Sequence, residues 1–181
     1  MAITISGDGS ITGLAVGGLP DGTVDNDTIA AATIADAKMA SGGGKVLQVV
    51  QGTTTTQVST SATTWIDSGL TASITPSSTS SKILVFFTTM LAVGSGADIH
   101  GGIRLMRGAS IIQDYGTYTW GNYDAGENPF KYGSFSTNYL DSPSTVSATT
   151  YKYQGRNYSY GTFYMQIASR PASIVLIEIG A

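Results

Sequence analysis

The chain has 181 residues, of which 12% are charged, and its formal net charge is −3. Its nine Lys and Arg residues are scattered, whereas proteins that bind nucleic acids or anionic membranes cluster their cations, so neither partner is expected. Because the chain has no cysteine, disulfides, thiolate metal sites and cysteine nucleophiles are excluded.

Residues 1–41 are predicted to form an extended N-terminal arm for attachment and trimerisation. The segment is rich in Gly, Ala, Thr and Asp, and a larger apolar side chain recurs at every fifth position. A period of five forms neither the stripe of an amphipathic helix nor one face of a strand, so the arm cannot build its own core. We expect another copy of the arm beside it; the alternative is a Gly-rich tail with chance spacing. The six recurring positions are Leu14, Leu19, Val24, Ile29, Ile34 and Met39.

No targeting or membrane-spanning segment is predicted. The start of the chain, MAITISGDGS, has neither the basic stretch nor the apolar stretch of a secretory signal, which favours synthesis in a cytoplasm. The most apolar run, residues 82–94, is too short and too rich in threonine to span a bilayer. Release by lysis would still allow the protein to act outside the cell.

A run of three glycines, residues 42–44, precedes Lys45 and raises the question of a phosphate-binding loop. Such a loop needs a glycine five positions before the Gly-Lys pair, a Ser or Thr after the lysine, and then a helix. Met39 and Val46 occupy those two positions, and a strand-forming run follows. Residues 42–44 are therefore interpreted as a flexible joint between the arm and the rest of the chain.

Residues 45–181 are predicted to form an all-β, antiparallel sandwich of about eight strands. Val, Ile, Thr, Tyr and Phe, which suit a pleated sheet, occur in short runs that clusters of Gly, Ser, Pro and Asn separate. Gly108, within MRGAS (106–110), marks a hairpin turn. The strand-forming runs lie in residues 45–51, 63–74, 81–93, 102–115, 131–140, 147–154, 162–169 and 172–180.

Two of these runs are apolar on both faces. In residues 174–179, Ile174 and Leu176 share a face with Glu178, while the opposite face is also aliphatic. A sandwich strand that faces water is expected to be polar on one side, so a long loop or another subunit is expected to cover the outer face. In residues 83–91, Leu84, Phe86 and Met90 oppose Ile83, Val85, Phe87 and Leu91.

Catalytic and metal-binding patterns are weak. The single histidine, His100, is expected at a loop-to-strand edge facing solvent or in a turn, and no G-x-S-x-G nucleophile motif occurs. Residues 21–27 contain three aspartates without the spacing of a calcium-binding loop. No metal, cofactor or enzymatic activity is therefore expected. A minor alternative is a glycan-cleaving protein that uses two of Asp114, Asp124, Glu127 and Asp141.

Two segments, 115–133 and 151–164, contain most of the tyrosines and one of the two tryptophans, with Gly, Asn, Ser and Thr between them. Rigid aromatic rings beside small polar residues are typical of contact loops, and aromatic faces also stack on sugar rings. The alternative is that these are ordinary strand aromatics. The candidate receptor contacts are Tyr118, Trp120, Tyr123, Tyr158 and Tyr160, with Gly121, Asn122 and Asn157 expected to leave backbone and amide groups accessible beside them.

Three stretches resemble fibre-type virion proteins of tailed bacteriophages, including those of marine and cyanobacterial hosts. They are GKVLQVVQGTTTTQVSTSATTWIDSGLTASITPSSTSSKILV, NYLDSPSTVSATTYKYQ and the closing IVLIEIGA. The arm sequence DGTVDNDTIAAATIADAKMA is similar to the stalk segments of the same proteins. The resemblance covers nearly the whole chain but rests on structural motifs, so it implies no catalytic residue.

The resemblance implies a jelly-roll-like β-sandwich that assembles as a homotrimer on the virion, after synthesis in the cytoplasm of a bacterial host. The arm would attach to other virion proteins of the tail or the capsid, and the sandwich would bind a host-surface receptor such as a glycan. The stalk of about 40 residues is shorter than that of many fibres. This length also suits a capsid decoration or cement protein that stabilises the phage head, so that alternative stays open.

Overall fold

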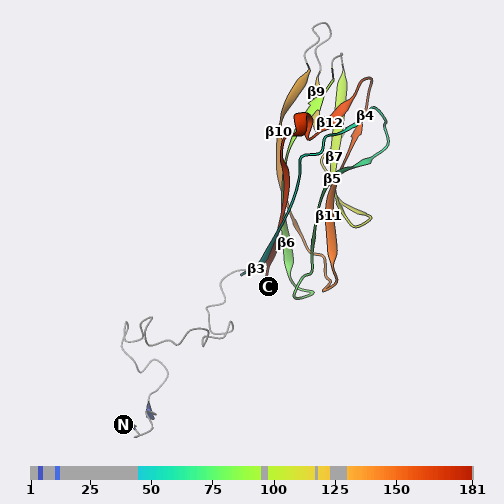
Figure 1. The fold of residues 1–181 in the computed structure, drawn as a ribbon. Coiled ribbons are helices and arrows are strands. Elements are labelled where there is room, and N and C mark those ends of the chain that lie inside the picture. The colour runs from blue at the N-terminus through green and yellow to red at the C-terminus, as the bar shows by residue number, and fades with distance from the viewer. Residues whose placement is uncertain are drawn as a thin grey trace. The chain divides into compact units, whose positions relative to one another are not determined.

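The computed structural model describes residues 4–5, 11–12, 45–94, 98–116, 118–122 and 130–180 (Figure 1). The chain divides into two units, residues 1–43 and 44–181. In the first unit, strand β1 (Thr4–Ile5) pairs antiparallel with β2 (Ile11–Thr12). The six apolar positions of the arm and the glycines of the predicted joint lie outside the described residues, so their roles stay predictions.

The second unit contains two antiparallel sheets. In the first sheet, the central strand β6 (Lys82–Val93) pairs along one edge with β10 (Lys131–Asp141). Its other edge pairs with β13 (Ala172–Ile179) and, further along, with β12 (Phe163–Met165). Strands β3 (Val46–Thr54) and β4 (Val58–Thr60) pair in turn with β13 and β12 and complete this sheet. A 3-10 turn, η2 (Ile167–Ser169), links β12 to β13.

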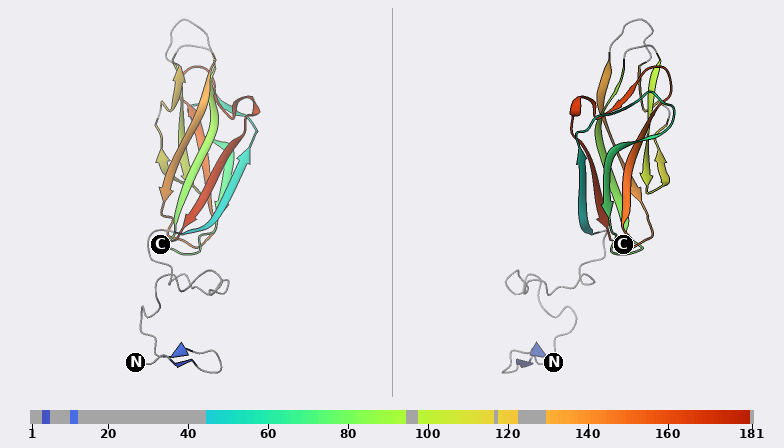
Figure 2. Two further views of the ribbon diagram at one scale, coloured as in Figure 1. Left: turned by 90° about the vertical axis from the view of Figure 1, so that its left-hand side faces the viewer. Right: turned by 45° about the vertical axis from the view of Figure 1, so that its right-hand side comes forward.

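The second sheet has the order β5, β11, β7 and then β8, with β9 pairing on the same edge of β7 as β8. Its strands are β5 (Ile66–Ile74), β7 (Ile99–Arg107), β8 (Ser110–Asp114), β9 (Trp120–Asn122) and β11 (Thr149–Asn157). The two sheets face each other in the views of Figure 2, which confirms the predicted all-β sandwich.

The strand order is that of a jelly roll. Strands β3 and β4, β8 and β9, and β12 and β13 each occupy one position in a sheet, which gives eight positions in the described part of the second unit. The first position pairs with the eighth, the second with the seventh, the third with the sixth and the fourth with the fifth. This is the pairing of a long antiparallel ribbon that folds over on itself, as in jelly rolls.

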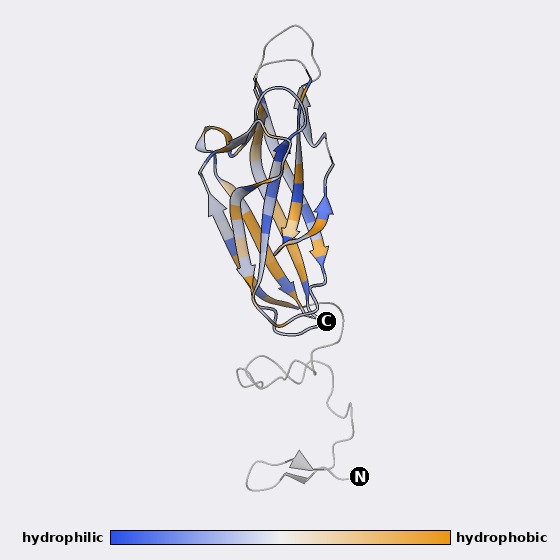
Figure 3. Cartoon of the chain, turned by 90° about the vertical axis from the view of Figure 1, so that its right-hand side faces the viewer, coloured by the Kyte–Doolittle hydropathy of each residue, from blue (hydrophilic) through white to orange (hydrophobic). Residues whose placement is uncertain are grey.

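Period-two alternation explains why most of these strands form where the sequence predicts them. Burial alternates at every residue along β5, β10, β11 and β13, and hydrophobic and polar bands follow each other along the strands in Figure 3. The predicted hairpin is confirmed: Arg107 pairs with Ser110 across the turn, and Gly108 has a φ of 57°, which favours glycine. The three-residue strands β4 and β9 are too short to give a periodic signal.

The core between the sheets is held by aromatic side chains. Phe87 of β6 stacks on Tyr153 of β11 with ring centroids 3.5 Å apart, and this contact joins one sheet to the other. Phe135 of β10 packs edge-on against Phe87 at 6.0 Å. Phe163 of β12 lies so close to Gly101 of β7 that a Cβ there would be 2.1 Å from the ring. The sheets therefore meet through large rings that pack against backbone.

His100 differs from its sequence-based expectation. It is 7% exposed and lies in β7, which begins at Ile99 rather than at the predicted Gly102. The ring of Tyr118 packs edge-on against the imidazole at 4.7 Å, so the prediction of a solvent-facing or turn histidine is wrong.

No helix in the described ranges has the length and apolar character that a membrane span requires.

Candidate binding surface

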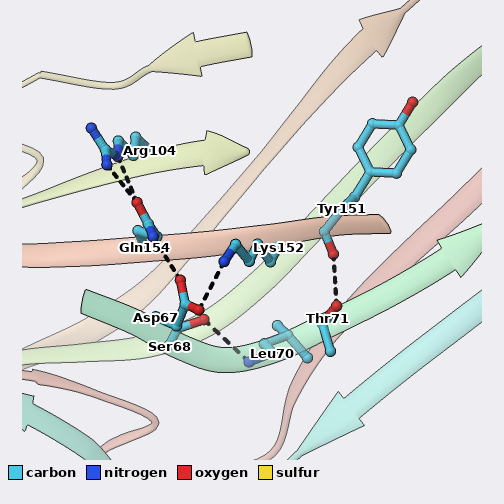
Figure 4. A network of polar contacts seen from close by, with 8 residues as sticks. All are labelled: Asp67, Ser68, Leu70, Thr71, Arg104, Tyr151, Lys152 and Gln154. Carbon is cyan, nitrogen blue, oxygen red and sulfur yellow. Dashed lines mark hydrogen bonds and ion pairs between the residues drawn. The ribbon is translucent and has the colours of Figure 1, made fainter. Parts of the chain in front are cut away.

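A row of polar side chains crosses the outer face of the second sheet. Strand register places Gln154 of β11 between Asp67 of β5 and Arg104 of β7. Both Nε and Nη2 of Arg104 donate to Oε1 of Gln154, at 2.8 and 2.6 Å. Nε2 of Gln154 donates to Asp67 at 2.6 Å, and Nζ of Lys152 lies 2.8 Å from the other carboxylate oxygen of Asp67 (Figure 4). This chain of contacts holds one edge of the Arg104 guanidinium in a defined orientation.

Beside this row lies a group of four side chains, Trp65, Arg104, Arg156 and Tyr158, which we call the Trp65 cluster. The guanidinium carbons of Arg104 and Arg156 lie 4.4 and 4.5 Å from the centre of the Trp65 ring. Arg156 also lies 3.8 Å from the centre of the Tyr158 ring and donates a hydrogen bond to its hydroxyl. The two aromatic rings pack edge to face at 6.5 Å. Two cations therefore share one indole.

Gly102 of β7 makes room for this cluster. A Cβ at Gly102 would be 2.6 Å from the Tyr158 ring and 3.4 Å from the Trp65 ring. His100, two residues earlier on the same face of β7, carries the Tyr118 ring in the same way. Small or flat residues on β7 thus let tyrosines lie against the outer face of the sheet.

The Trp65 cluster carries two positive charges, and Asp114 lies opposite Arg104 in the register of β7 and β8. Burial lowers the pKa of the Arg104 guanidinium, Asp114 raises it, and the positive charge of Arg156 lowers it, with a net shift below the usual value. Burial alone raises the pKa of Asp67, but hydrogen bonds from Lys152 and Gln154 lower it below its usual value. Lys152 therefore neutralises Asp67, whereas neither Arg104 nor Arg156 forms an ion pair with a described residue.

The structure separates the five predicted receptor contacts. Tyr118 and Tyr160 are exposed, at 64% and 91%, and Tyr158 is half-buried in the Trp65 cluster. Tyr123 lies outside the described residues. Trp120 is half-buried and packs against the core.

The surroundings of Trp120 indicate a packing role rather than an exposed contact. Its Nε1 donates to the carbonyl of Lys131 at 3.4 Å, and a Cβ at Gly133 would be 2.2 Å from the ring. Asn157, which was expected to present an accessible amide, is fully buried. Its Nδ2 donates to the carbonyls of Ser159 and Gly161 at 2.5 and 3.0 Å, so it shapes the turn that carries Tyr160.

Sequence reasoning missed Trp65, Arg104, Arg156, Gln154 and Asp67. Arg156 lies two residues before Tyr158 in a segment already singled out, and that spacing places both on one face of an extended chain. Trp65 and Arg104 are distant from it in sequence and carry no comparable local signal. The pairing of β11 with both β7 and β5 brings them together.

The outer face of the first sheet is apolar at one end. Val49, Ile177, Leu84 and Leu140 lie side by side across four strands, and Val175 and Phe86 are neighbours in the next row. We call these six residues the apolar face. Strands β10, β6, β13 and β3, which carry this face, lie in front in the left view of Figure 2. One step further along, the row is polar and consists of Thr53, Ser173, Thr88 and Ser136.

The carboxylates considered for glycan cleavage are not brought into one described group. Asp141 is buried, accepts a hydrogen bond from the Tyr151 hydroxyl at 2.6 Å and pairs with Arg107 at 2.9 Å. Asp114 is exposed and accepts a hydrogen bond from the backbone of Gly116. Asp124 and Glu127 lie outside the described residues, and no group of metal-ligating side chains occurs within the described ones.

Solved structures that this chain resembles include two of infectious bursal disease virus, from the Gt and Gx strains. Each aligns at 12% sequence identity with a TM-score of 0.41, over 74% of this chain and 38% of the viral chain. This chain therefore spans less than half the length of the viral chains that it matches. A likeness at this level carries no conclusion about function. No protein-family model matches the sequence, and no curated protein sequence matches it.

Proposed function

We propose that the chain is a non-enzymatic structural protein of a phage virion, made in the cytoplasm of the bacterial host. In this proposal it forms a homotrimeric short fibre, attaches to other virion proteins through residues 1–41, and displays its jelly roll to bind a host-surface receptor. The observation that carries the proposal is the contrast between the outer faces of the two sheets.

The apolar face favours burial against protein. Exposed apolar side chains gathered on one sheet face are typical of an interaction surface, because their transfer out of water is favourable. The apolar face includes Val49, which lies three residues after the start of β3 at Val46. Strand β3 is the first strand of the sandwich and follows the arm in the sequence. This supports assembly through one sheet and the arm.

The outer face of the second sheet favours display. It presents arginines, tyrosines and a tryptophan in a fixed arrangement, and these are the residue types that dominate recognition surfaces. Chains with few charges and many hydroxyls stay soluble while offering hydrogen bonds to a ligand. A fibre that contacts a host surface needs one face of each kind.

The test uses phage particles. The full chain is expected to be present in purified virions, to form trimers by light scattering at micromolar concentration, and to bind host cells as purified protein. A monomeric protein that is absent from virions would contradict the proposal. The same preparation incubated with host surface polysaccharide is expected to release no new reducing ends.

A capsid decoration protein is the second candidate, which the short arm favours. Deleting residues 1–41 is expected to leave a folded sandwich that no longer joins the particle, because a domain of about 140 residues buries roughly two thirds of its surface without the arm. Particles made with the truncated protein would then lack it. If these particles have a less stable capsid but adsorb to host cells normally, the protein is a decoration protein rather than a fibre.

A further inference from the structure

We propose that the Trp65 cluster is a binding site for a carboxylate-bearing saccharide, with Arg104 and Arg156 as the residues that contact the carboxylate. This inference rests on the receptor-binding part of the proposed function and specifies its ligand class. It is carried by the arrangement of the two arginines against Trp65.

Arg104 and Arg156 bring two positive charges to the Trp65 cluster. Two guanidinium groups within 4.5 Å of one ring centre repel each other, and among the described residues neither has an ion-pair partner. The Nε of Arg156 is also buried without a described hydrogen-bond partner. An anion that contacts both groups would offset the repulsion and accept hydrogen bonds from their remaining accessible N–H groups. The site is therefore complementary to negative charge.

Neighbouring side chains hold both arginines in a fixed geometry. Gln154 and Asp67 hold Arg104 from one edge, and stacking on Trp65 and Tyr158 holds Arg156. Side chains that are already ordered lose little entropy on binding. Guanidinium groups match the two oxygens of a carboxylate through paired hydrogen bonds, which a lysine ammonium cannot do.

The surroundings of the Trp65 cluster favour a saccharide over an acidic peptide as the ligand. The exposed ring of Tyr118, which packs against His100 on the same face of β7, gives a flat face on which a sugar ring stacks at a small entropic cost. The same sheet face carries hydroxyl groups, with Ser73 and Thr150 hydrogen-bonded to each other at 2.7 Å. Hydroxyls and aromatic faces suit a ligand that is itself rich in hydroxyls.

The experiment measures binding of the full chain to saccharides by biolayer interferometry. The probes are a galacturonic acid hexamer and an α2,8-linked sialic acid hexamer. The controls are the methyl ester of the galacturonic acid hexamer, which keeps the rings and removes the charge, and polyglutamate of matched charge. At least one acidic hexamer is expected to bind, with an affinity that falls as salt is raised and at least about tenfold more tightly than the ester and polyglutamate.

Three variants of the two arginines locate the site. Arg104→Gln and Arg156→Gln are each expected to weaken binding at least about tenfold, and Arg156→Lys is expected to restore little because it keeps the charge without the planar fork. Arg170→Gln removes an exposed arginine outside the cluster and is the matched control. Unchanged thermal midpoints show that each variant is folded, and the ester comparison needs no variant.

The proposal is overturned if neither acidic hexamer binds, if the ester or polyglutamate binds as tightly, or if Arg170→Gln weakens binding as much as the cluster variants. Binding of the purified protein to host cells separates this failure from that of the proposed function. If the protein binds host cells but neither hexamer, only the saccharide inference is contradicted. If the protein binds neither host cells nor the hexamers, the proposed receptor function is contradicted as well.

Discussion

Glu178 shows at the scale of one residue how a charge is tolerated inside this sandwich. The residue is fully buried on the core face of β13, beside Leu176 and Ile174. Ser77 donates to its Oε1 from the backbone and the hydroxyl, at 2.7 and 2.6 Å, and Gln48 donates to Oε2 at 2.5 Å. Burial alone raises the pKa of Glu178, but these hydrogen bonds lower it by more, from 4.5 to about 2.

This shift predicts how stability depends on pH. Because the pKa of Glu178 is lower in the folded chain than in the unfolded chain, its contribution is complete above pH 4.5 and is lost as pH falls toward 2. We expect Glu178→Gln to lower the free energy of unfolding by roughly 1–3 kcal/mol at pH 7. Urea unfolding at pH 7 and pH 3 measures the difference, which should shrink at the lower pH. An equal difference at both pH values would contradict this assignment.

Tyr160 and Trp120 separate surface from support at the same scale. Tyr160 is almost fully exposed, whereas Trp120 packs against the core and over Gly133. We therefore expect Tyr160→Ala to leave the thermal midpoint unchanged and to weaken adsorption to host cells. Trp120→Ala is expected to lower stability by about 3 kcal/mol or more through the cavity it leaves. Calorimetry and a cell-binding assay measure the two effects, and a stable Trp120→Ala protein would contradict the packing role.

At the scale of elements, the close approach of β3 to β5 at one edge of the sandwich depends on Gly52. A Cβ at Gly52 would be 2.0 Å from the backbone oxygen of Thr71, and a backbone atom cannot rotate away as a side chain can. Gly52→Ala is expected to lower the free energy of unfolding, measured by urea unfolding, by about 1–3 kcal/mol. Gly94→Ala is the matched control, because its Cβ would meet its neighbours no closer than 3.6 Å. Equal stability of the two variants would show that β3 can shift.

At the scale of the whole molecule, the apolar face predicts self-association. We expect the double substitution of Phe86→Asp and Leu140→Asp to weaken the proposed trimer at least about tenfold, because two charges would be desolvated in the contact. Thr88→Asp and Ser136→Asp on the same two strands form the control, since these residues lie in the polar row beside the apolar face. Light scattering over a dilution series measures the mass. An unchanged trimer in the first variant would place the contact elsewhere.

Much of the fold was predictable because its signals are local. Alternation along β5 and β11 is a property of neighbouring residues, and the hairpin at Gly108 needs four residues to be recognised. The burial of Ile174, Leu176 and Glu178 on one face follows from the same period of two. His100 was misjudged because the glycines that follow it suggested a loop, whereas Phe163 and Tyr158 pack on those glycines within a strand.

The sequence by itself determined that the chain forms short antiparallel strands with an arm of different composition, because backbone propensity and periodicity act over a few residues. Only the tertiary structure decided which residues meet at the Trp65 cluster and in the polar row beside it. Gln154 lies 50 residues from Arg104 and 87 from Asp67 along the chain, and they meet because β11 pairs with both β7 and β5. Pairing between distant strands depends on the fit of the whole core, which no local pattern encodes.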